Sequence, residues 1–307
     1  MKPAFSVIIF TTLAGAAQGL VVTLALAVLA GLPLAPGFAG IALIIAEAML
    51  LVALGASFGH LGRPGQAWRS VLMWRTSWLS REVIVLPVFI GVNALWWLAL
   101  RQGIHTPLLP LAAIALAVLL WYCTAMIYAC LRFIQEWAQP LTLVNFMLIG
   151  LSSGLVLATA LAALLGEPAL LRVTAPGALL VTAVAWTTRM LALRRNAVLR
   201  PRSTLQSATG IPATKLVQKS MGMSAGSFNT REFFHGASRA ALKQIKLGFI
   251  LLAFVLPALL LLWALSTQST LGFVLALVVQ APGLIAERWF FFAEARHPQN
   301  LYYQVVS

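Results

Sequence analysis

Eight long apolar stretches constrain the fold of this 307-residue chain more than any other feature. They cover about residues 5–31, 38–58, 83–100, 108–131, 142–165, 174–193, 246–266 and 270–292. A helix rises about 1.5 Å per residue, so about 20 apolar residues cross the hydrocarbon core of a bilayer. Each stretch is close to that length and is bounded by Gly, Pro or charged residues. The sequence therefore predicts an all-α integral membrane protein with eight transmembrane helices, folded as a single membrane domain over residues 1–307.

The composition supports this class. Hydrophobic residues make up 61% of the chain and the mean hydropathy is +0.93, whereas about half of a typical soluble domain is apolar. The net charge is +14, because 21 Lys and Arg are balanced by only seven acidic residues, all of them Glu. Such an excess can indicate nucleic-acid binding, but these cations fall between apolar stretches, as they do in membrane proteins. We therefore expect contact with membrane lipid and no nucleic-acid partner.

The distribution of Lys and Arg predicts the orientation of the chain. The side that carries both termini holds 19 of these residues, and the other side holds only Arg101 and Arg172. Because cytoplasmic loops carry the excess of positive charge, we expect both termini to face the cytoplasm from the inner membrane. The first apolar stretch is longer than the 7 to 15 residues of a signal-peptide core, so we expect it to be retained as a span.

The largest loop on the predicted cytoplasmic side covers about residues 194–245. It is basic and contains Phe228, Phe233 and Phe234 among small polar residues. Two interpretations remain open. The loop is a disordered segment that touches anionic lipid, or it is a docking surface for a peripheral subunit.

The segment from His60 to Glu82, HLGRPGQAWRSVLMWRTSWLSRE, has unusual chemistry for a membrane protein. It places one histidine, four arginines, one glutamate and three tryptophans between two apolar stretches. The Arg63-Pro64 step breaks any helix that leaves the second stretch, so His60 is predicted at a helix end near the membrane surface. The segment is then either an interfacial loop that only sets the topology, or a site where His60 exchanges a proton or hydrogen-bonds a quinone carbonyl.

A few polar side chains lie within the apolar stretches. Glu47 is near the middle of the second stretch, where a carboxylate is costly and is either a proton-transfer group or a protonated structural tie. Thirteen residues, about 20 Å of helix, separate it from His60, so we expect at most a route through water between them. Gln18 and Tyr128 are each either an interhelical hydrogen-bond tie or part of a ligand site.

The cysteines and histidines limit the cofactors that this chain can hold. Cys123 and Cys130 are the only cysteines, and an iron–sulfur cluster needs four ligands; we expect both to be small buried residues. The histidines at positions 60, 105, 235 and 297 all lie outside the predicted spans, so a haem held by two histidines within the membrane is not expected. We also expect no metal site.

The pattern H-L-G-x-P, then alanine followed by an aromatic residue, then S-x-E, resembles the DMSO reductase anchor subunit (DmsC) family. These are the quinol-reactive membrane subunits of molybdopterin iron–sulfur oxidoreductases. The opening PAFSVIIFTTLAGAAQG is also similar to anchors of this family, especially those attached to sulfite-oxidising enzymes. Two features depart from the pattern: the loop is more basic than usual, with Arg63 and Arg75, and Arg81 precedes the glutamate where the family has an uncharged residue.

The resemblance implies a complex of three subunits. A molybdopterin catalytic subunit and an iron–sulfur subunit would dock on this anchor, which would exchange two electrons and two protons with ubiquinone or menaquinone. The charge count predicts that they dock on the cytoplasmic side, the reverse of the DMSO reductase arrangement. By position, His60 and Glu82 match the family's quinone-site histidine and glutamate. The candidate quinone-binding residues are His60, Arg63, Glu82, Gln18 and Tyr128, and the candidate proton-transfer residues are His60, Glu82 and Glu47.

The favoured reaction is the oxidation of sulfite to sulfate, with electrons passed to the quinone pool. Reduction of DMSO or another S- or N-oxide is the alternative within the family. Two other classes of membrane protein are alternatives. A small-solute transporter should show inverted repeats with broken helices at matched positions, which the sequence lacks. A purely structural anchor would bind no quinone of its own.

Overall fold

The computed structural model describes residues 1–35, 37–59, 61–220 and 228–303 of the chain. Within these residues it is all-helical, and eight helical segments are long and apolar enough to cross a membrane, which confirms the predicted fold class. The first six are α1 (Phe5–Leu29), α2 (Phe38–Phe58), α3 (Trp78–Arg101), α4 (Leu108–Ala129), α5 (Pro140–Leu165) and α6 (Pro168–Ala197). The seventh, Arg239–Thr267, joins α9 (Arg239–Ile250), the π-helical turn η2 (Leu251–Val255) and α10 (Leu256–Thr267), and the eighth is α11 (Thr270–Glu294).

Several helices extend beyond the apolar stretches that predicted them. α3 begins five residues before the predicted position 83, because Ser77 caps the helix by accepting a hydrogen bond from the backbone N–H of Ser80. α6 begins at Pro168 and reaches Ala197, beyond the predicted 174–193 at both ends. In contrast, α4 ends at Ala129 rather than 131, so Cys130 is exposed while Cys123 is buried. The expectation that both cysteines are buried is therefore wrong for Cys130.

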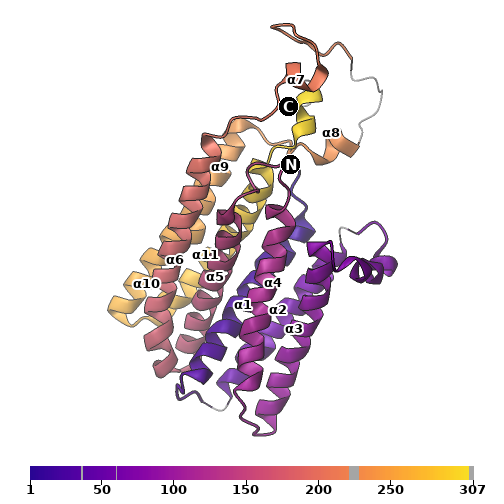
Figure 1. Ribbon diagram of the computed structural model, residues 1–307. Coiled ribbons are helices and arrows are strands. Elements are labelled where there is room, and N and C mark those ends of the chain that lie inside the picture. The colour runs from indigo at the N-terminus through magenta and orange to yellow at the C-terminus, as the bar shows by residue number, and fades with distance from the viewer. Residues whose placement is uncertain (36, 60, 221–227, 304–307) are drawn as a thin grey trace.

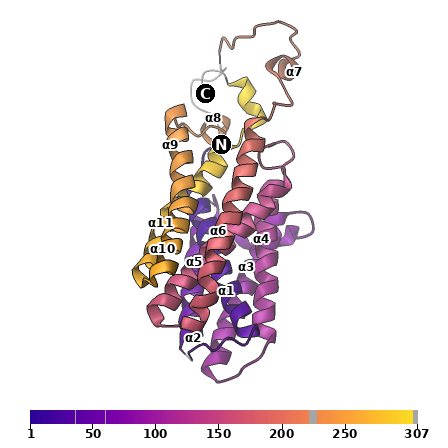
Figure 2. The same ribbon diagram turned by 90° about the vertical axis from the view of Figure 1, so that its left-hand side faces the viewer.

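The centre of the bundle is the packing of α1 against α5. Each helix carries a G-x-x-x-G motif, Gly15 to Gly19 in α1 and Gly150 to Gly154 in α5. A Cβ atom on Gly19 or Gly154 would overlap the backbone of the facing helix. Small residues at this spacing allow close helix contact in membranes, where helix association depends on packing. α2, α3 and α4 lie on one side of this pair, and α6, α9, α10 and α11 lie on the other (Figures 1 and 2).

Different contacts hold the chain together at the two ends of the bundle. At one end, the backbone nitrogen of Met1 lies 2.8 Å from the carbonyl oxygen of Ala295, so the N-terminus lies against the segment that follows α11 (Figure 1). At the other end, the Glu167 carboxylate accepts a hydrogen bond of 2.9 Å from the backbone N–H of Ala35, which joins two loops. We call the first end the terminus side; its location in the cytoplasm stays a prediction from the charge count.

The described parts of the 194–245 loop fold over the terminus side. They contain the short helices α7 (Leu205–Thr209) and α8 (Phe228–Glu232), which lie near the 3-10 helix η3 (Pro298–Tyr302) in Figure 1. The Phe233 ring stacks on the His297 ring with centroids 3.7 Å apart, and the Tyr302 hydroxyl donates to the Ala208 carbonyl at 2.9 Å. These contacts argue against disorder in the described parts of the loop, and the docking-surface interpretation stays a prediction.

Candidate functional site

The segment that follows α2 forms a side loop on the terminus side of the bundle. It contains the 3-10 helix η1 (Pro64–Met73), which projects sideways from the ends of α2 and α3 (Figure 1). Arg63 precedes η1 and is exposed, and so are Trp68, Leu72 and Trp74. Exposed tryptophan and arginine side chains are typical of the membrane interface. His60 lies outside the described residues, so its predicted role stays a prediction.

Arg81 attaches this loop to the start of α3. Its Nε donates to the carbonyl oxygen of Trp74 at 2.9 Å, and its Nη2 donates to the carbonyl oxygen of Arg75 at 2.8 Å. The guanidinium carbon also lies 4.0 Å from the centroid of the Trp78 ring, within the range of a cation–π interaction. Among the described residues Arg81 forms no ion pair with Glu82. The residue that departs from the family pattern is therefore a structural link beside the candidate site.

Glu82 is buried between α3 and α4, with 5% of its surface exposed. The hydroxyl of Thr124 in α4 donates a hydrogen bond to its carboxylate. The structure places Glu82 five residues into α3 rather than at the start of the helix, because the helix begins at Trp78. A buried carboxyl group held by one hydroxyl is suited to accept and return a proton beside a bound ligand.

Tyr128 lies one helical turn beyond Thr124 on the same face of α4. Its ring packs among Trp137, Phe146, Phe291 and Phe292, with centroids between 5.2 and 5.6 Å away. Thr124, one turn earlier on this face, is the residue that contacts Glu82. The structure thus brings two predicted site residues, Glu82 and Tyr128, into one region of the bundle.

The other predicted residues are not joined to this region by a hydrogen bond. Gln18 is buried in the middle of α1, and its Oε1 has no hydrogen-bond partner among the described residues. Glu47 is half-buried in α2, and its Oε2 likewise lacks a partner in the part of the chain that the structure describes. Neither the proton-transfer role nor the structural role of Glu47 is decided by these contacts.

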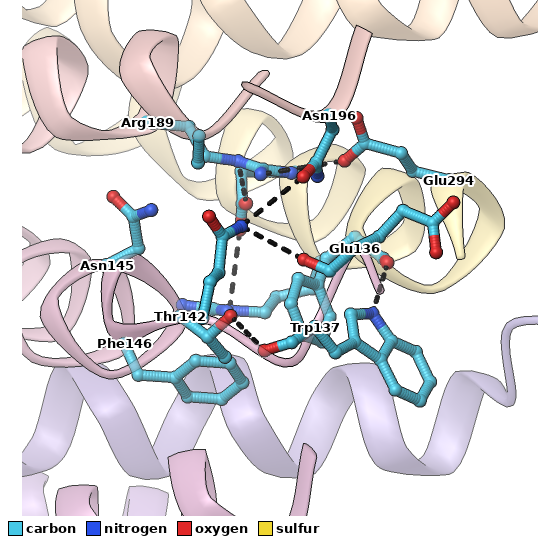
Figure 3. A pocket seen from close by; sticks show the side chains of 13 residues that line it. Glu136, Trp137, Thr142, Asn145, Phe146, Arg189, Asn196 and Glu294 are labelled. Atoms are coloured by element: carbon cyan, nitrogen blue, oxygen red, sulfur yellow. Dashed lines mark hydrogen bonds and ion pairs between the residues drawn. The ribbon is translucent and has the colours of Figure 1, made fainter. Parts of the chain in front are cut away.

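A second group of polar residues lies between α5, α6 and α11, and the sequence analysis did not identify it as a site. Arg189 Nε is 2.7 Å from Glu287 Oε1, and Arg189 Nη1 is 3.7 Å from Glu294 Oε2. Arg288 Nε is 3.5 Å from Glu287 Oε2, and its guanidinium carbon lies 4.0 Å above the Phe146 ring. Arg189, Glu287 and Arg288 are at most 4% exposed. Figure 3 shows these groups around a small cavity.

The cavity beside these ion pairs is too small for a quinone ring. It is lined by Glu136, Asn145, Phe146, Asn196 and the ion-paired residues, and it leaves room for about one water molecule. The group was missed because Arg189 and Arg288 were counted as loop charges when the orientation was predicted. Without them the terminus side still holds 17 Lys and Arg against two, so the predicted orientation does not change. The heptad spacing of Arg189 from Thr182 and Asn196, and of Glu287 from Gln280 and Glu294, is the sequence signal that could have found the group.

Eight apolar spans, two G-x-x-x-G motifs that face each other, and a buried carboxyl group beside a basic, tryptophan-rich loop are the features of a membrane-embedded subunit with a candidate site on the terminus side. Residues 1–293 match the family described as DMSO reductase anchor subunit (DmsC). The chain belongs to this family, which confirms the resemblance found in the sequence. It is also 44% identical over 326 aligned positions to a sulfite dehydrogenase subunit of Allochromatium vinosum, and the alignment covers the whole of both chains. The small-solute transporter alternative gains no support from either match.

Proposed function

We propose that this chain is the membrane anchor and quinone-reactive subunit of a sulfite dehydrogenase. The complex would oxidise sulfite to sulfate and pass the electrons to the quinone pool. The observation that carries the proposal is the full-length similarity to a sulfite dehydrogenase subunit. The buried Glu82–Thr124 pair on the terminus side supports the quinone-reactive role, since a structural anchor alone does not require a carboxyl group at that position.

The substrate at the membrane site is ubiquinone or menaquinone, which accepts two electrons and two protons when it is reduced. The chemistry of the residues fits such a head group. The Glu82 carboxyl transfers a proton, and the Thr124 hydroxyl fixes its orientation. Arg63, in the loop that Arg81 attaches to α3, and His60, which lies outside the described residues, supply groups that donate hydrogen bonds to carbonyl oxygens. Tyr128 closes the site on the α4 side.

The partners are an iron–sulfur subunit and a molybdopterin catalytic subunit, docked on the cytoplasmic side of the inner membrane. The terminus side supports this surface in two ways. The described part of the 194–245 loop presents exposed cations at Arg194, Arg200, Arg202, Lys215, Lys219, Arg231, Arg239 and Lys243. Glu82 lies near the start of α3, at the same end of the bundle, so an iron–sulfur cluster docked there would be within reach for electron transfer to the quinone.

The second candidate is the anchor of an enzyme that oxidises quinol and reduces DMSO or another S- or N-oxide. The family description itself favours it, since it names a DMSO reductase. Purifying the intact complex and supplying sulfite with a short-chain quinone separates the two. We expect sulfite-dependent reduction of the quinone. Absence of this reaction beside rapid quinol-driven reduction of DMSO would establish the second candidate instead.

A further inference from the structure

One face of the 3-10 helix η1 is apolar and is turned away from the protein. A 3-10 helix has three residues per turn, so residues three apart lie on the same face. Trp68, Val71 and Trp74 have this spacing. The backbone N–H of Trp74 donates to the Val71 carbonyl at 3.2 Å, so the turn geometry continues to Trp74. All three side chains are exposed, Trp68 by 64%, and an exposed apolar face of this kind is a contact surface for lipid or for another protein.

The neighbouring face of η1 carries positive charge. Arg69, Leu72 and Arg75 each follow a residue of the apolar face and are also exposed. The guanidinium carbon of Arg69 lies 5.7 Å from the centroid of the Trp68 ring. The guanidinium carbon of Arg75 lies 5.4 Å from the centroid of the Trp74 ring. The two faces together therefore present two pairs, each of one cation and one aromatic ring.

The third face of η1 is the one that meets the protein. Ala67 and Ser70 are half-buried, and the Ser70 hydroxyl donates to the Ala67 carbonyl at 2.6 Å. Small side chains at these two positions allow η1 to pack against α3, although Met73 at the end of the same face is exposed. The apolar face and the charged face consequently point outward.

η1 lies at the level where the spans end on the terminus side. In Figure 1 it projects sideways from α2 and α3 and stays apart from α7, α8 and η3, which lie beyond the end of the bundle. A helix beside the bundle at this level lies among lipid headgroups. A peripheral subunit would instead meet first the segments that extend beyond the end of the bundle. The position of η1 therefore favours lipid over protein as its partner.

The arginines of η1 have no carboxylate in the described protein to neutralise them. The sequence holds no acidic residue between Glu47 and Glu82. Glu82 is buried and accepts a hydrogen bond from Thr124. The ion pairs among the described residues all involve side chains of α6 and α11. The two positive charges of η1 therefore remain available to an anion from outside the chain.

A topology signal alone does not account for this arrangement. Orientation depends on the number of Lys and Arg residues in a loop and does not require that each arginine lies beside an aromatic ring. A free phosphate ion would contact the arginines and leave the tryptophans in water. An anionic phospholipid supplies a partner for both, because its phosphate attracts the cations while tryptophan rings lie at the level of the headgroups.

We propose that η1 and the two residues after it, Trp74 and Arg75, lie in the plane of the membrane surface and bind anionic phospholipid headgroups. We call residues 64–75 the lipid arm. Arg69 and Arg75 are about 12 Å apart along the axis, at about 2.0 Å per residue, so each contacts a headgroup of its own. Trp68 and Trp74 pack against the glycerol and upper acyl region of the same lipids. This binding does not depend on the reaction that the complex catalyses.

The test uses the intact complex in phosphatidylcholine nanodiscs that contain a trace of photoreactive phosphatidylglycerol, with crosslinks located by peptide mass spectrometry. Peptides of the lipid arm should be labelled, and unlabelled phosphatidylglycerol should displace the label where additional phosphatidylcholine does not. High salt should weaken the labelling. An arginine near an anionic surface strengthens binding about 5-fold, so the double variant Arg69→Gln, Arg75→Gln should lower the labelling about 5-fold. The double variant Arg69→Lys, Arg75→Lys keeps the charge and should keep most of the labelling.

Arg101→Gln is the matched control. Arg101 is an exposed arginine at the opposite end of α3, and its guanidinium carbon also lies 5.7 Å from the centroid of a tryptophan ring, that of Trp97. Its replacement should leave the labelling of the lipid arm unchanged. Dye-linked turnover and the amount of assembled complex should be normal in every variant.

Three results would overturn the proposal. The first is equal displacement of the label by phosphatidylcholine and phosphatidylglycerol, which would make the lipid arm an ordinary interfacial loop; this comparison uses the unchanged chain, so it holds even if a variant fails to fold. The second is wild-type labelling in the double Gln variant. The third is an unlabelled lipid arm that crosslinks to the iron–sulfur subunit, which would make it a protein-docking surface.

Discussion

Arg81 should control how firmly the η1 loop is held beside Glu82. Its guanidinium donates to the carbonyl oxygens of Trp74 and Arg75 and lies over the Trp78 ring. Hydrogen bonds to a charged group contribute about 1.5 to 3 kcal/mol each when protected from water, and a cation–π contact at an exposed site about 0.5 to 1 kcal/mol. Because Arg81 is only half-buried, we discount these values to about 2 kcal/mol for the whole set. Arg81→Ala should therefore raise the open population of the loop about 30-fold.

Hydrogen–deuterium exchange of the intact complex measures this opening directly. The backbone N–H groups of Trp74, Thr76 and Ser77 are bonded within the loop, at 2.9 to 3.2 Å, and should lose protection about 30-fold in Arg81→Ala. The KM for quinone should rise, while turnover with a soluble dye stays normal. Arg69→Gln is the control, since Arg69 is exposed and its only described contact is with the neighbouring Trp68 ring. Unchanged exchange in Arg81→Ala, or equal loss of protection in Arg69→Gln, would show that Arg81 does not hold the loop.

Three further predictions concern packing, orientation and the loop histidine. In a thermal unfolding assay, Gly154→Ala should destabilise the anchor by about 3 kcal/mol, at the upper end of overpacking effects, because the added methyl group meets the α1 backbone. Gly91→Ala is the control: a methyl group there faces open space, so the stability should not change. A reporter that fluoresces only in the cytoplasm, fused after Ser307, should be bright. A dark fusion that is well expressed would show that the orientation is the reverse of the predicted one. His60→Ala should abolish quinone-linked turnover and preserve dye-linked turnover; equal loss of both would mean that the substitution disrupts assembly.

The number of spans could be predicted from the sequence, because the bilayer thickness sets the length of apolar sequence that each span requires, and eight stretches have that length. The helix ends could not, since capping by Ser77 and the N-terminal Pro168 of α6 extend helices into polar sequence where hydropathy gives no indication. The packing of α1 on α5 was also missed. The G-x-x-x-G motifs are visible in the chain, but only the structure shows that they face each other.

The candidate site was predicted in part. The motif that ends at Glu82 identified the carboxyl group, but its partner Thr124 comes from a different helix and carries no motif. The ion pairs of Arg189 with Glu287 and Glu294 were missed because charges near the ends of apolar stretches were assigned to loops. The heptad spacing of Gln280, Glu287 and Glu294 in α11 is the pattern that a search for polar helix faces would have found.

In the proposed function, Glu82 is the proton-transfer residue of a quinone site in a sulfite dehydrogenase anchor. The most direct measurement is the ratio of sulfite-to-quinone turnover to sulfite-to-dye turnover in a Glu82→Gln complex, across the pH range in which the wild type is active. We expect this ratio to fall about 100-fold while the dye reaction and the amount of assembled complex in the membranes stay normal. Thr124→Val, which removes only the orienting hydroxyl, should give a smaller fall. A Glu82→Gln complex with the wild-type ratio at every pH would contradict the claim.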